Sequence, residues 1–569
     1  MVFGEKRGAD YIIVKNINTQ HSGEPKKDKT RKKIRVLKTD SNKAIDTVLN
    51  TKQDAPTAGD VVKSMTHINQ TNISYHLAYD HLKKRMNMTE GDILNSFQMI
   101  IPFLQSFATS NQGATVEVEK ENGTHHLQRI FLCPGFVNNN LQYVRPVISC
   151  DACHLKSKHK GMLYMFTCLS GKNEVYILAF GIASGNEDEN NWSWMLKNFS
   201  KACPNINLPR IKRTDTPSQN DTSAEDIPEY KFNEILFVSD RDKGLGKAFD
   251  KILPNNLCLN CAVHIKANVC QKYGKACSET VLPISKSYST QDEDFYLQKL
   301  KEMNESAFNY VEGIEKNRWR STEWVQMDSN LPPRYRIVSS NTSESANSMI
   351  LKFRELSWME CIKSIVEYMC KSIANKRELH KKNNQNECVP FTLQMLNKRF
   401  QASLKVTIFE REANVAEYTC FEDRNTSSTN QQVSTATIVN ILRPDQKRCS
   451  CGKWQDFKIP CRHAIAYFCK EHLMSVESLG EIEVHWLYKY WSLHALYKKN
   501  ISPVIVDHLR KDGQTLPPKV HVPTGRPKKK RIRNRSEFGD PSESTIHCSI
   551  CKQAGHNKRS CTLIAAMKK

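Results

Sequence analysis

An apolar run that stops abruptly at a carboxylate constrains the fold of this chain more than any other feature. Residues 235–239 read Ile-Leu-Phe-Val-Ser, Asp240 follows directly, and a turn leads into a helix-like segment over residues 246–252. Buried strands of α/β sheets have this pattern, and ligands and metals gather at the carboxyl ends of such strands. The sequence therefore predicts an α/β sheet that presents Asp240 at one edge.

A second acid, Asp151, stands in the same context, at the end of the apolar run 144–150. Two further apolar runs, 162–169 and 175–182, are joined by Ser-Gly-Lys-Asn, which predicts a hairpin. A predicted helix follows, and then the strand before Asp240. This order suits a ribonuclease-H-like α/β core, in which the first and fourth strands are neighbours. By that fold-level analogy, Asp151 and Asp240 meet in space.

The net charge of +23, from 83 Lys and Arg against 60 Asp and Glu, indicates a polyanionic partner, most often nucleic acid. No apolar stretch approaches ~20 residues, so we expect no transmembrane helix and no membrane partner. No apolar secretory segment follows the first residues, which indicates a reducing, intracellular compartment. In that compartment, the 20 cysteines are expected to be metal ligands or buried side chains instead of disulfides.

Two sets of cysteine and histidine have the spacing of structural zinc sites. They are, in order, Cys449, Cys451, Cys461 and His463, and Cys548, Cys551, His556 and Cys561. Four thiolate and imidazole donors suit tetrahedral Zn²⁺, and a closed set of four indicates a structural role. The second set has the spacing of a CCHC zinc knuckle, a module that contacts single-stranded nucleic acid or proteins. The sequence therefore predicts two zinc ions.

Two basic tracts lie outside these sets. Residues 26–38 are consistent with a solvated disordered arm, a nuclear localisation signal or a DNA-contacting arm. The second tract begins Gly525-Arg526-Pro527, which can lie extended in a narrow A·T-rich minor groove and resembles an AT-hook. Its candidate DNA-binding residues are Arg526, Lys528, Lys529, Lys530 and Arg531. A plain nuclear localisation signal is an equal alternative, and we expect a nuclear protein.

Convergent carboxylates would suit a pair of Mg²⁺ or Mn²⁺ ions, because such ions prefer oxygen ligands and can activate a water or a 3′-hydroxyl at a phosphodiester. Asp151 and Asp240 meet this need, and an acid on a later helix would complete the set. Cys261-x₂-His264 is half a metal site at best, and such a pair is more often a packed cysteine and a hydrogen-bonded histidine.

Several motifs in order resemble those of the Mutator-like element (MULE) transposases. They are residues 151–194, 238–245, Cys261-x₂-His264 and 340–347, with Cys449, Cys451, Cys461 and His463 matching the SWIM-type zinc finger and a CCHC knuckle at the end. The resemblance covers roughly residues 60–562. It implies a DDE/D transposase on a ribonuclease-H-like core with a helical insertion. It also implies two structural Zn²⁺ ions and a catalytic pair of Mg²⁺ or Mn²⁺.

The resemblance implies that Asp151 and Asp240 are the first two catalytic acids and Glu344 the third, with Cys261 and His264 in supporting roles. Other glutamates lie near the third position, namely Glu312, Glu323, Glu355 and Glu360. Glu344 is preferred because its neighbours predict a helix start.

The sequence also departs from the family. Many relatives carry an acid in the turn that is Ser170-Gly171-Lys172-Asn173 here, and many have an N-terminal zinc or WRKY-like domain whose ligand set is missing before residue 140. Recognition of the element ends is therefore unassigned, or falls to the basic arm and the helical segment after it.

The domain prediction follows from these features. In order, it comprises a basic disordered arm (1–59), a helical, DNA-binding candidate region (60–140), a ribonuclease-H-like transposase domain (141–380) with a helical insertion at about 265–335, a β-rich connector (389–443), a SWIM zinc finger (444–475), a helical segment (476–515), an AT-hook-like linker (516–540) and a CCHC knuckle (545–563).

The function predicted first is that of a DNA transposase acting on double-stranded DNA, at element ends and target, as a homodimer or higher assembly. A domesticated, non-catalytic DNA-binding regulator derived from such a transposase is the alternative. An RNA-binding protein would explain the charge and the knuckle but not the acids.

Overall fold

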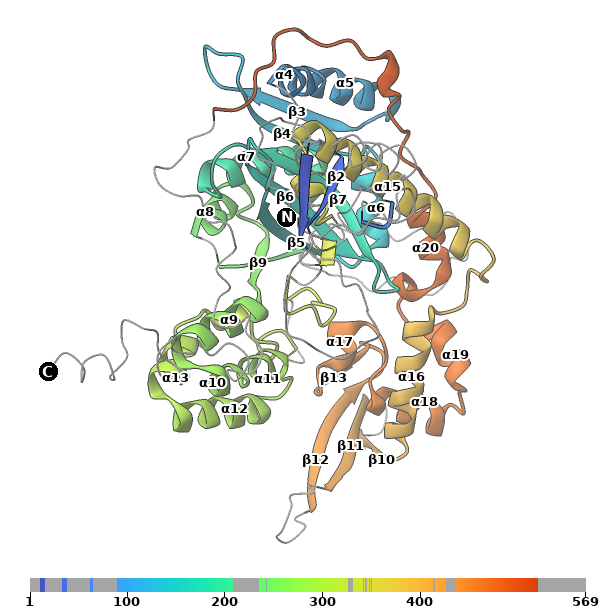
Figure 1. The fold of residues 1–569 in the computed structure, drawn as a ribbon. Helices are drawn as coiled ribbons and strands as arrows, with labels where there is room; N and C mark the ends of the chain where they lie inside the picture. Colours follow the sequence, from blue (N-terminus) through green and yellow to red (C-terminus); the bar gives the residue numbers. More distant parts are fainter. Residues whose placement is uncertain are drawn as a thin grey trace, which may run out of the picture.

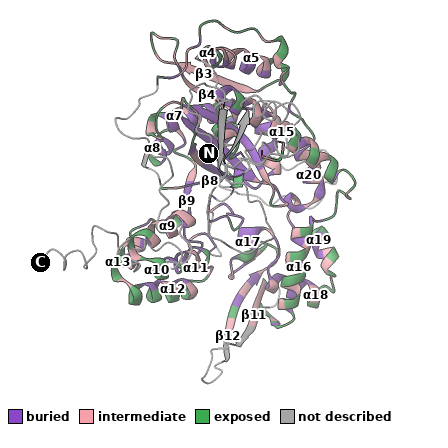
Figure 2. Cartoon of the chain, in the orientation of Figure 1, coloured by how far each residue is buried: buried purple, intermediate pink, exposed green. Residues whose placement is uncertain are grey.

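The computed structural model describes residues 90–207, 235–241, 243–325, 331–340, 342, 345, 346, 348, 350–412, 415–425 and 435–519, with 11–15, 33–37 and 62–64. A large mixed sheet forms the upper body in Figure 1, and a cluster of helices and a second sheet extend below it. Buried residues concentrate in the large sheet and the helices that pack on it (Figure 2). Within the described residues, no helix is long and apolar enough to cross a membrane.

The large sheet has seven strands. In spatial order they are β3 (Thr115–Lys120), β4 (Leu127–Cys133), β7 (Val175–Ala183), β6 (Met162–Leu169), β5 (Val147–His154), β8 (Leu236–Ser239) and β9 (Leu257–Asn260). Neighbours are antiparallel from β3 to β5, whereas β8 is parallel to β5 and β9 is parallel to β8. The fold is therefore mixed α/β, and the first and fourth strands of the predicted core do pair.

Helices cover the large sheet. They are α4 (Glu90–Gln98), α5 (Ile100–Ser110), α6 (Val137–Asn140), α7 (Glu189–Ala202), α8 (Lys243–Ile252) and α15 (Trp358–His380). Alternate residues of β6 point to the same face of the sheet. On the face covered by α7, Phe166 of β6 stacks on Phe199 of α7, with ring centroids 4.4 Å apart. The Asp188 side chain caps α7 by accepting a hydrogen bond from the Asn191 amide. The helix predicted between the hairpin and the strand before Asp240 is confirmed.

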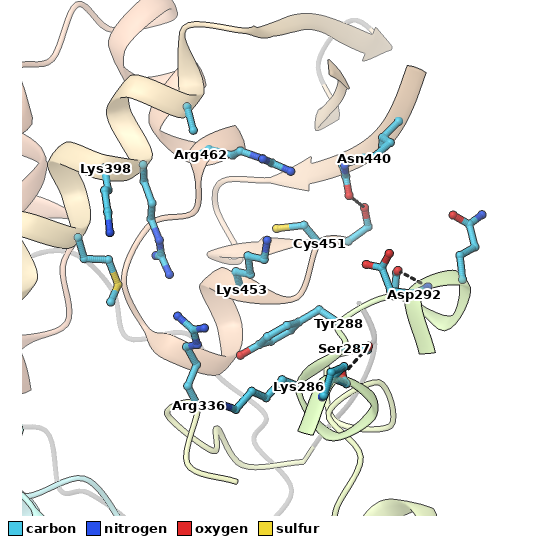
Figure 3. Close-up of a pocket in the computed structure, with 18 of the residues that line it drawn as sticks. Lys286, Ser287, Tyr288, Asp292, Arg336, Lys398, Asn440, Cys451, Lys453 and Arg462 are labelled. Carbon is cyan, nitrogen blue, oxygen red and sulfur yellow. Dashed lines mark hydrogen bonds between the residues drawn. The ribbon is translucent and has the colours of Figure 1, made fainter. Parts of the chain in front are cut away.

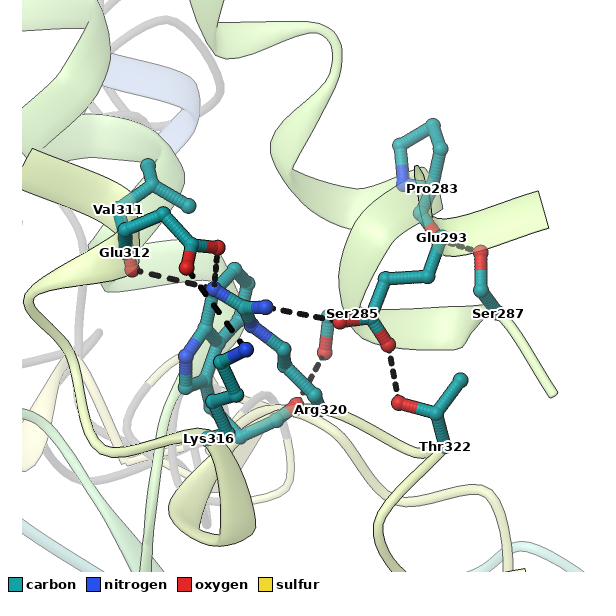
Figure 4. A network of polar contacts seen from close by, with 10 residues as sticks. Pro283, Ser285, Ser287, Glu293, Val311, Glu312, Lys316, Arg320 and Thr322 are labelled. Atoms are coloured by element: carbon teal, nitrogen blue, oxygen red, sulfur yellow. Dashed lines mark hydrogen bonds and ion pairs between the residues drawn. The ribbon is translucent and has the colours of Figure 1, made fainter. Parts of the chain in front are cut away.

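Between β9 and residue 325 the chain forms a helical unit with its own apolar core. Its helices are α9 (Ala262–Tyr273), α10 (Lys275–Ser278), α11 (Val281–Lys286), α12 (Thr290–Met303) and α13 (Glu305–Glu312). A fully buried Arg320 donates to Glu293 at 2.8 Å and to Glu312 at 2.6 Å (Figure 4). This unit is called the helical insertion below, and it overlaps the range of about 265–335 for which the sequence predicts an insertion.

The second sheet has the order β10 (Val406–Glu412), β11 (Val415–Asn425), β12 (Thr435–Arg443) and β13 (Arg448–Cys449), all antiparallel. Helices α16 (Pro390–Ser403), α17 (Lys453–Phe457), α18 (Arg462–Glu471), α19 (Val476–Ile482) and α20 (Tyr490–Leu496) accompany it. Helix α16 corrects the expectation of a β-rich segment from residue 389. Pro390 suits the first helical turn, where its missing N–H leaves no hydrogen bond unmade.

Short 3₁₀ helices complete the described elements: η1 (Leu141–Tyr143), η2 (Pro204–Asn207), η4 (Lys316–Arg318), η5 (Phe353–Glu355), η6 (Trp486–Tyr488) and η7 (Val506–His508). Strands β1 (Tyr11–Lys15) and β2 (Lys33–Leu37) pair within the arm predicted to be disordered. These two segments are therefore strands and not disordered chain as expected, and both are rich in residues that favour strands.

Candidate functional site

Asp151 lies in β5, and Asp240 directly follows β8, the parallel neighbour of β5. Ser149 of β5 is paired with Val238 of β8, and continuing that register by two residues sets Asp151 beside Asp240. Backbones of neighbouring strands lie about 4.8 Å apart, and residues in parallel register point to the same face. Both side chains are half-buried. The sequence predicted that Asp151 would follow its strand, but Asp151 lies inside β5. Asp240 directly follows β8, as predicted.

Cys261 joins the end of β8 to a segment much later in the chain. Its amide donates to the Ser239 carbonyl at 2.7 Å, and its Sγ accepts from the Ser340 amide at 3.2 Å. The Ala262 amide donates to the Val338 carbonyl at 2.8 Å. The motif predicted to support the acids therefore connects the residue before Asp240 to residues 338–340.

The third predicted acid, Glu344, lies outside the described residues, and so do Asn341 and Asn347. The described residues around it, Thr342, Ser345, Ala346 and Ser348, are helical, as the capping residues predicted. Thr342, the first of these helical residues, comes two positions after Ser340, whose amide contacts Cys261.

The Cys261 thiol has an altered acidity. Burial raises its pKa, but a hydrogen bond to His264, the charge of His264 and hydrogen bonds to Ser340 lower it further than burial raises it, so the pKa lies below the ordinary value. The Cys261 side chain is fully buried, so its sulfur acts inside the protein, as an acceptor that holds the Ser340 backbone in place.

Cys449, Cys451, Cys461 and His463 form a compact metal-binding cluster. Their donor atoms all lie within 4.8 Å of one another. Cys449 ends β13, Cys461 caps α18, and His463 lies in the first turn of that helix, with its Nδ1 3.3 Å from Cys449 Sγ. Hydrogen bonds from the Cys449 and Cys461 thiols lower the pKa of Cys451, which favours the thiolate that a zinc ion needs.

Asp456, in the nine-residue spacer of this cluster, fastens the zinc-binding segment to the helical insertion. Its buried carboxylate accepts from the Tyr288 hydroxyl at 2.5 Å, the Arg334 amide at 2.7 Å and the Arg336 amide at 3.3 Å. The Asp456 carbonyl accepts from the Tyr335 amide at 3.1 Å. Sequence reasoning missed this residue, because spacing identifies the zinc ligands and carries no signal for their neighbours.

Comparison with known families gives two matches. Residues 435–468 match the SWIM zinc finger, and they contain all four donors of the cluster. Residues 233–356 match the Mutator-family transposases, in a segment that contains Asp240, Cys261, His264 and the position of Glu344 but not Asp151. The resemblance to Mutator-family transposases is confirmed. No curated protein matches the chain.

These matches indicate a transposase-type function, DNA as a partner and Zn²⁺ at the SWIM finger. The other sequence predictions fall outside the described residues. They are the knuckle ligands Cys548, Cys551, His556 and Cys561, and the basic residues Arg526, Lys528, Lys529, Lys530 and Arg531. The second zinc ion and the AT-hook-like contacts therefore stay predictions.

Proposed function

We propose that this protein is a DNA transposase that cuts DNA at terminal inverted repeats and joins the ends to target DNA. The observation that carries the proposal is the parallel pairing of β5 with β8, whose register, continued by two residues, would set Asp151 beside Asp240, in a chain with a segment that matches the Mutator family. Glu344 is the third acid of the proposal by motif match, and four residues before it the Ser340 amide donates to Cys261.

The topology of the large sheet supports a ribonuclease-H-like core. The order β7-β6-β5-β8-β9, antiparallel up to β5 and parallel beyond it, is the order that aligns the first and fourth strands. The helical insertion leaves the core after β9 and rejoins it at residues 338–340. An insertion of this kind lets acids that are far apart in sequence share one site.

The donor set fits a pair of Mg²⁺ or Mn²⁺ ions, because two half-buried carboxylates at one edge of the sheet offer hard oxygen ligands. Such a pair supplies an activated water or 3′-hydroxyl and neutralises the leaving oxygen. Asp151 and Asp240 would hold it, together with Glu344. Cys261 acts as a positioning residue, since its sulfur holds the Ser340 amide beside the end of β8.

The test is metal-dependent cleavage of a plasmid that carries the genomic DNA flanking the coding sequence. We expect wild-type protein to cut in Mg²⁺ or Mn²⁺, and Asp151→Asn, Asp240→Asn and Glu344→Gln to be folded but inactive. The matched control is Asp250→Asn, since Asp250 is an exposed aspartate on α8, and it should cut like wild type. Cleavage by Asp240→Asn at the wild-type rate would refute the assignment.

The same assay separates the alternative function. A domesticated regulator would bind the flanking DNA without cutting it in either metal.

The proposal also includes a nuclear location and self-association on paired ends. Nuclear import and sedimentation of the protein–DNA complex are the respective measurements.

A further inference from the structure

A basic pocket lies between the helical insertion, α16 and the SWIM finger (Figure 3). Its volume is about 1020 Å³, at the upper end of the range for small-molecule sites. Six of the lining residues are cationic, namely Lys286, Arg336, Lys398, Arg399, Lys453 and Arg462, while Asp292 is the one carboxylate among the lining residues. The pocket therefore attracts an anion of considerable length.

Three of these cations reach the pocket from three different elements. Lys286 ends α11, Lys398 belongs to α16 and Lys453 begins α17, and each is exposed. Within the described part of the chain, no carboxylate forms an ion pair with any of the three ammonium groups. Their charges repel one another, and Asp292, the one carboxylate in the lining, balances only part of the six positive charges. A bound polyanion would relieve this repulsion.

The walls of the pocket are held firmly. On one side, the Tyr288 hydroxyl donates to Asp456, which fixes the insertion to the SWIM finger. On another side, Nη1 of Arg399 donates to the carbonyls of Ile459 and Pro460 at 2.7 and 2.8 Å, next to the zinc ligand Cys461. The arrangement of positive charge is thus built into the fold before any ligand arrives.

A short stretch of chain connects the pocket to the candidate acids. Arg336 lines it, and Ser340 contacts Cys261 only four residues later. Four residues span at most about 14 Å of chain. Cys261 in turn donates to the carbonyl of Ser239, the residue before Asp240. One wall of the pocket is thus connected, through residues 336–340 and Cys261, to the residue before Asp240.

We propose that this pocket binds the phosphate backbone of the DNA strand that enters the candidate active site. The inference rests on the proposed function. Lysine and arginine side chains bind phosphate groups of the nucleic-acid backbone. Such contacts position a strand without reading its sequence. Tyr296 also lines the pocket and offers an aromatic surface for an unpaired base.

The test uses full-length, zinc-loaded protein and fluorescence anisotropy with labelled duplex DNA, single-stranded DNA and single-stranded RNA over a range of salt concentrations. The pocket variant is Lys286→Gln/Lys398→Gln/Lys453→Gln. The matched control removes three exposed lysines on α15 and after α20, in Lys371→Gln/Lys498→Gln/Lys499→Gln. Circular dichroism and zinc content verify that both variants are folded.

For the pocket variant, the slope of log affinity against log salt should fall by about 2 to 3 for duplex or single-stranded DNA, because each lost phosphate contact removes slightly less than one unit. The control should keep the wild-type slope, and the DNA form that changes more is the one the pocket holds. A wild-type slope in the pocket variant, an equal change in both variants, or a change confined to RNA would overturn the inference.

Cleavage by the wild-type protein is read separately from binding. If wild type cuts DNA and the pocket variant binds it normally, the inference fails while the proposed function stands. If wild type does not cut but the pocket variant loses DNA binding, the proposed function fails while the pocket assignment stands.

Discussion

The Tyr288 hydroxyl donates a hydrogen bond of 2.5 Å to the Asp456 carboxylate, and this contact joins the helical insertion to the SWIM finger. The same carboxylate accepts the amides of Arg334 and Arg336, which precede the segment that contacts Cys261. The SWIM finger thereby fixes the backbone of Arg334 and Arg336, a few residues before Ser340. Its role extends beyond its own fold.

Replacing Tyr288 by phenylalanine removes the hydroxyl and leaves the Asp456 carboxylate, which is 4% exposed, with one donor fewer. Hydrogen bonds to charged groups contribute about 1.5–3 kcal/mol, so we expect a loss of that size in the free energy of unfolding, measured in urea. Tyr296→Phe is the matched control, because Tyr296 lines the same pocket. An equal loss in both variants would contradict the role given to the Tyr288–Asp456 contact.

Zinc content should separate the two predicted zinc sites. Wild-type protein is expected to hold two zinc ions per chain, and Cys451→Ser and Cys551→Ser one each, measured by mass spectrometry of the metal. Cys451→Ser should also destabilise the contacts of Asp456, because α17 lies between the ligands. Two zinc ions in Cys551→Ser would refute the knuckle, and two in Cys451→Ser would refute the SWIM site.

Gly452, between the ligand Cys451 and α17, has a φ of +73°, a conformation that glycine adopts at low cost. A Cβ there would lie 2.5 Å from the Cβ of Val325 and 2.9 Å from the Tyr288 ring. Gly452→Ala should therefore lower the melting temperature. Gly246→Ala is the matched control, because its site on α8 is open and alanine favours a helix by roughly 0.5–1 kcal/mol. Its melting temperature should rise, and a rise in Gly452→Ala would show that the finger is not packed as described.

The elements that the sequence predicted well are those with a strong apolar pattern. Strands β6 and β7 are buried along nearly their whole length, so they read as continuous apolar runs. Their order along the chain, with the two strand-then-Asp runs, was enough to predict that the strands leading to Asp151 and Asp240 would be neighbours, as β5 and β8 are. The zinc cluster could equally be predicted from the sequence, because all four ligands lie within fifteen positions of the chain.

The elements that it missed depend on tertiary contacts. Helix α16 buries Thr392, Leu396 and Ser403, two of which are polar, so it shows no apolar period. Arg320 and Glu293 read as surface charges, yet they form an ion pair in which both side chains are almost fully buried. Asp456 reads as a spacer residue, and its partners Tyr288 and Arg334 lie more than a hundred positions away. Burial of a charged side chain and hydrogen bonds between residues so far apart in the chain leave no pattern in the local sequence.

A pH-dependent part of the stability is expected from Glu174, at the start of the hairpin's second strand. Its carboxylate accepts from the Tyr497 hydroxyl at 3.0 Å and lies 3.6 Å from His380 and 3.9 Å from Lys376. Burial raises the pKa of Glu174, but His380, Lys376 and Tyr497 together lower it further, so the pKa lies below its ordinary value. The folded protein therefore favours the ionised carboxylate.

The sign of the effect follows from that direction. The stabilisation is fully present above the ordinary glutamate pKa of about 4.3 and is lost as the pH falls through the lower pKa of the folded state. Glu174→Gln should thus be less stable than wild type at neutral pH, and the gap in the free energy of unfolding should narrow below pH ~4.3. Glu378→Gln, at an exposed position on α15, is the control and should show a negligible gap at either pH. A gap for Glu174→Gln that widens in acid would mean that the carboxylate is held in its neutral form.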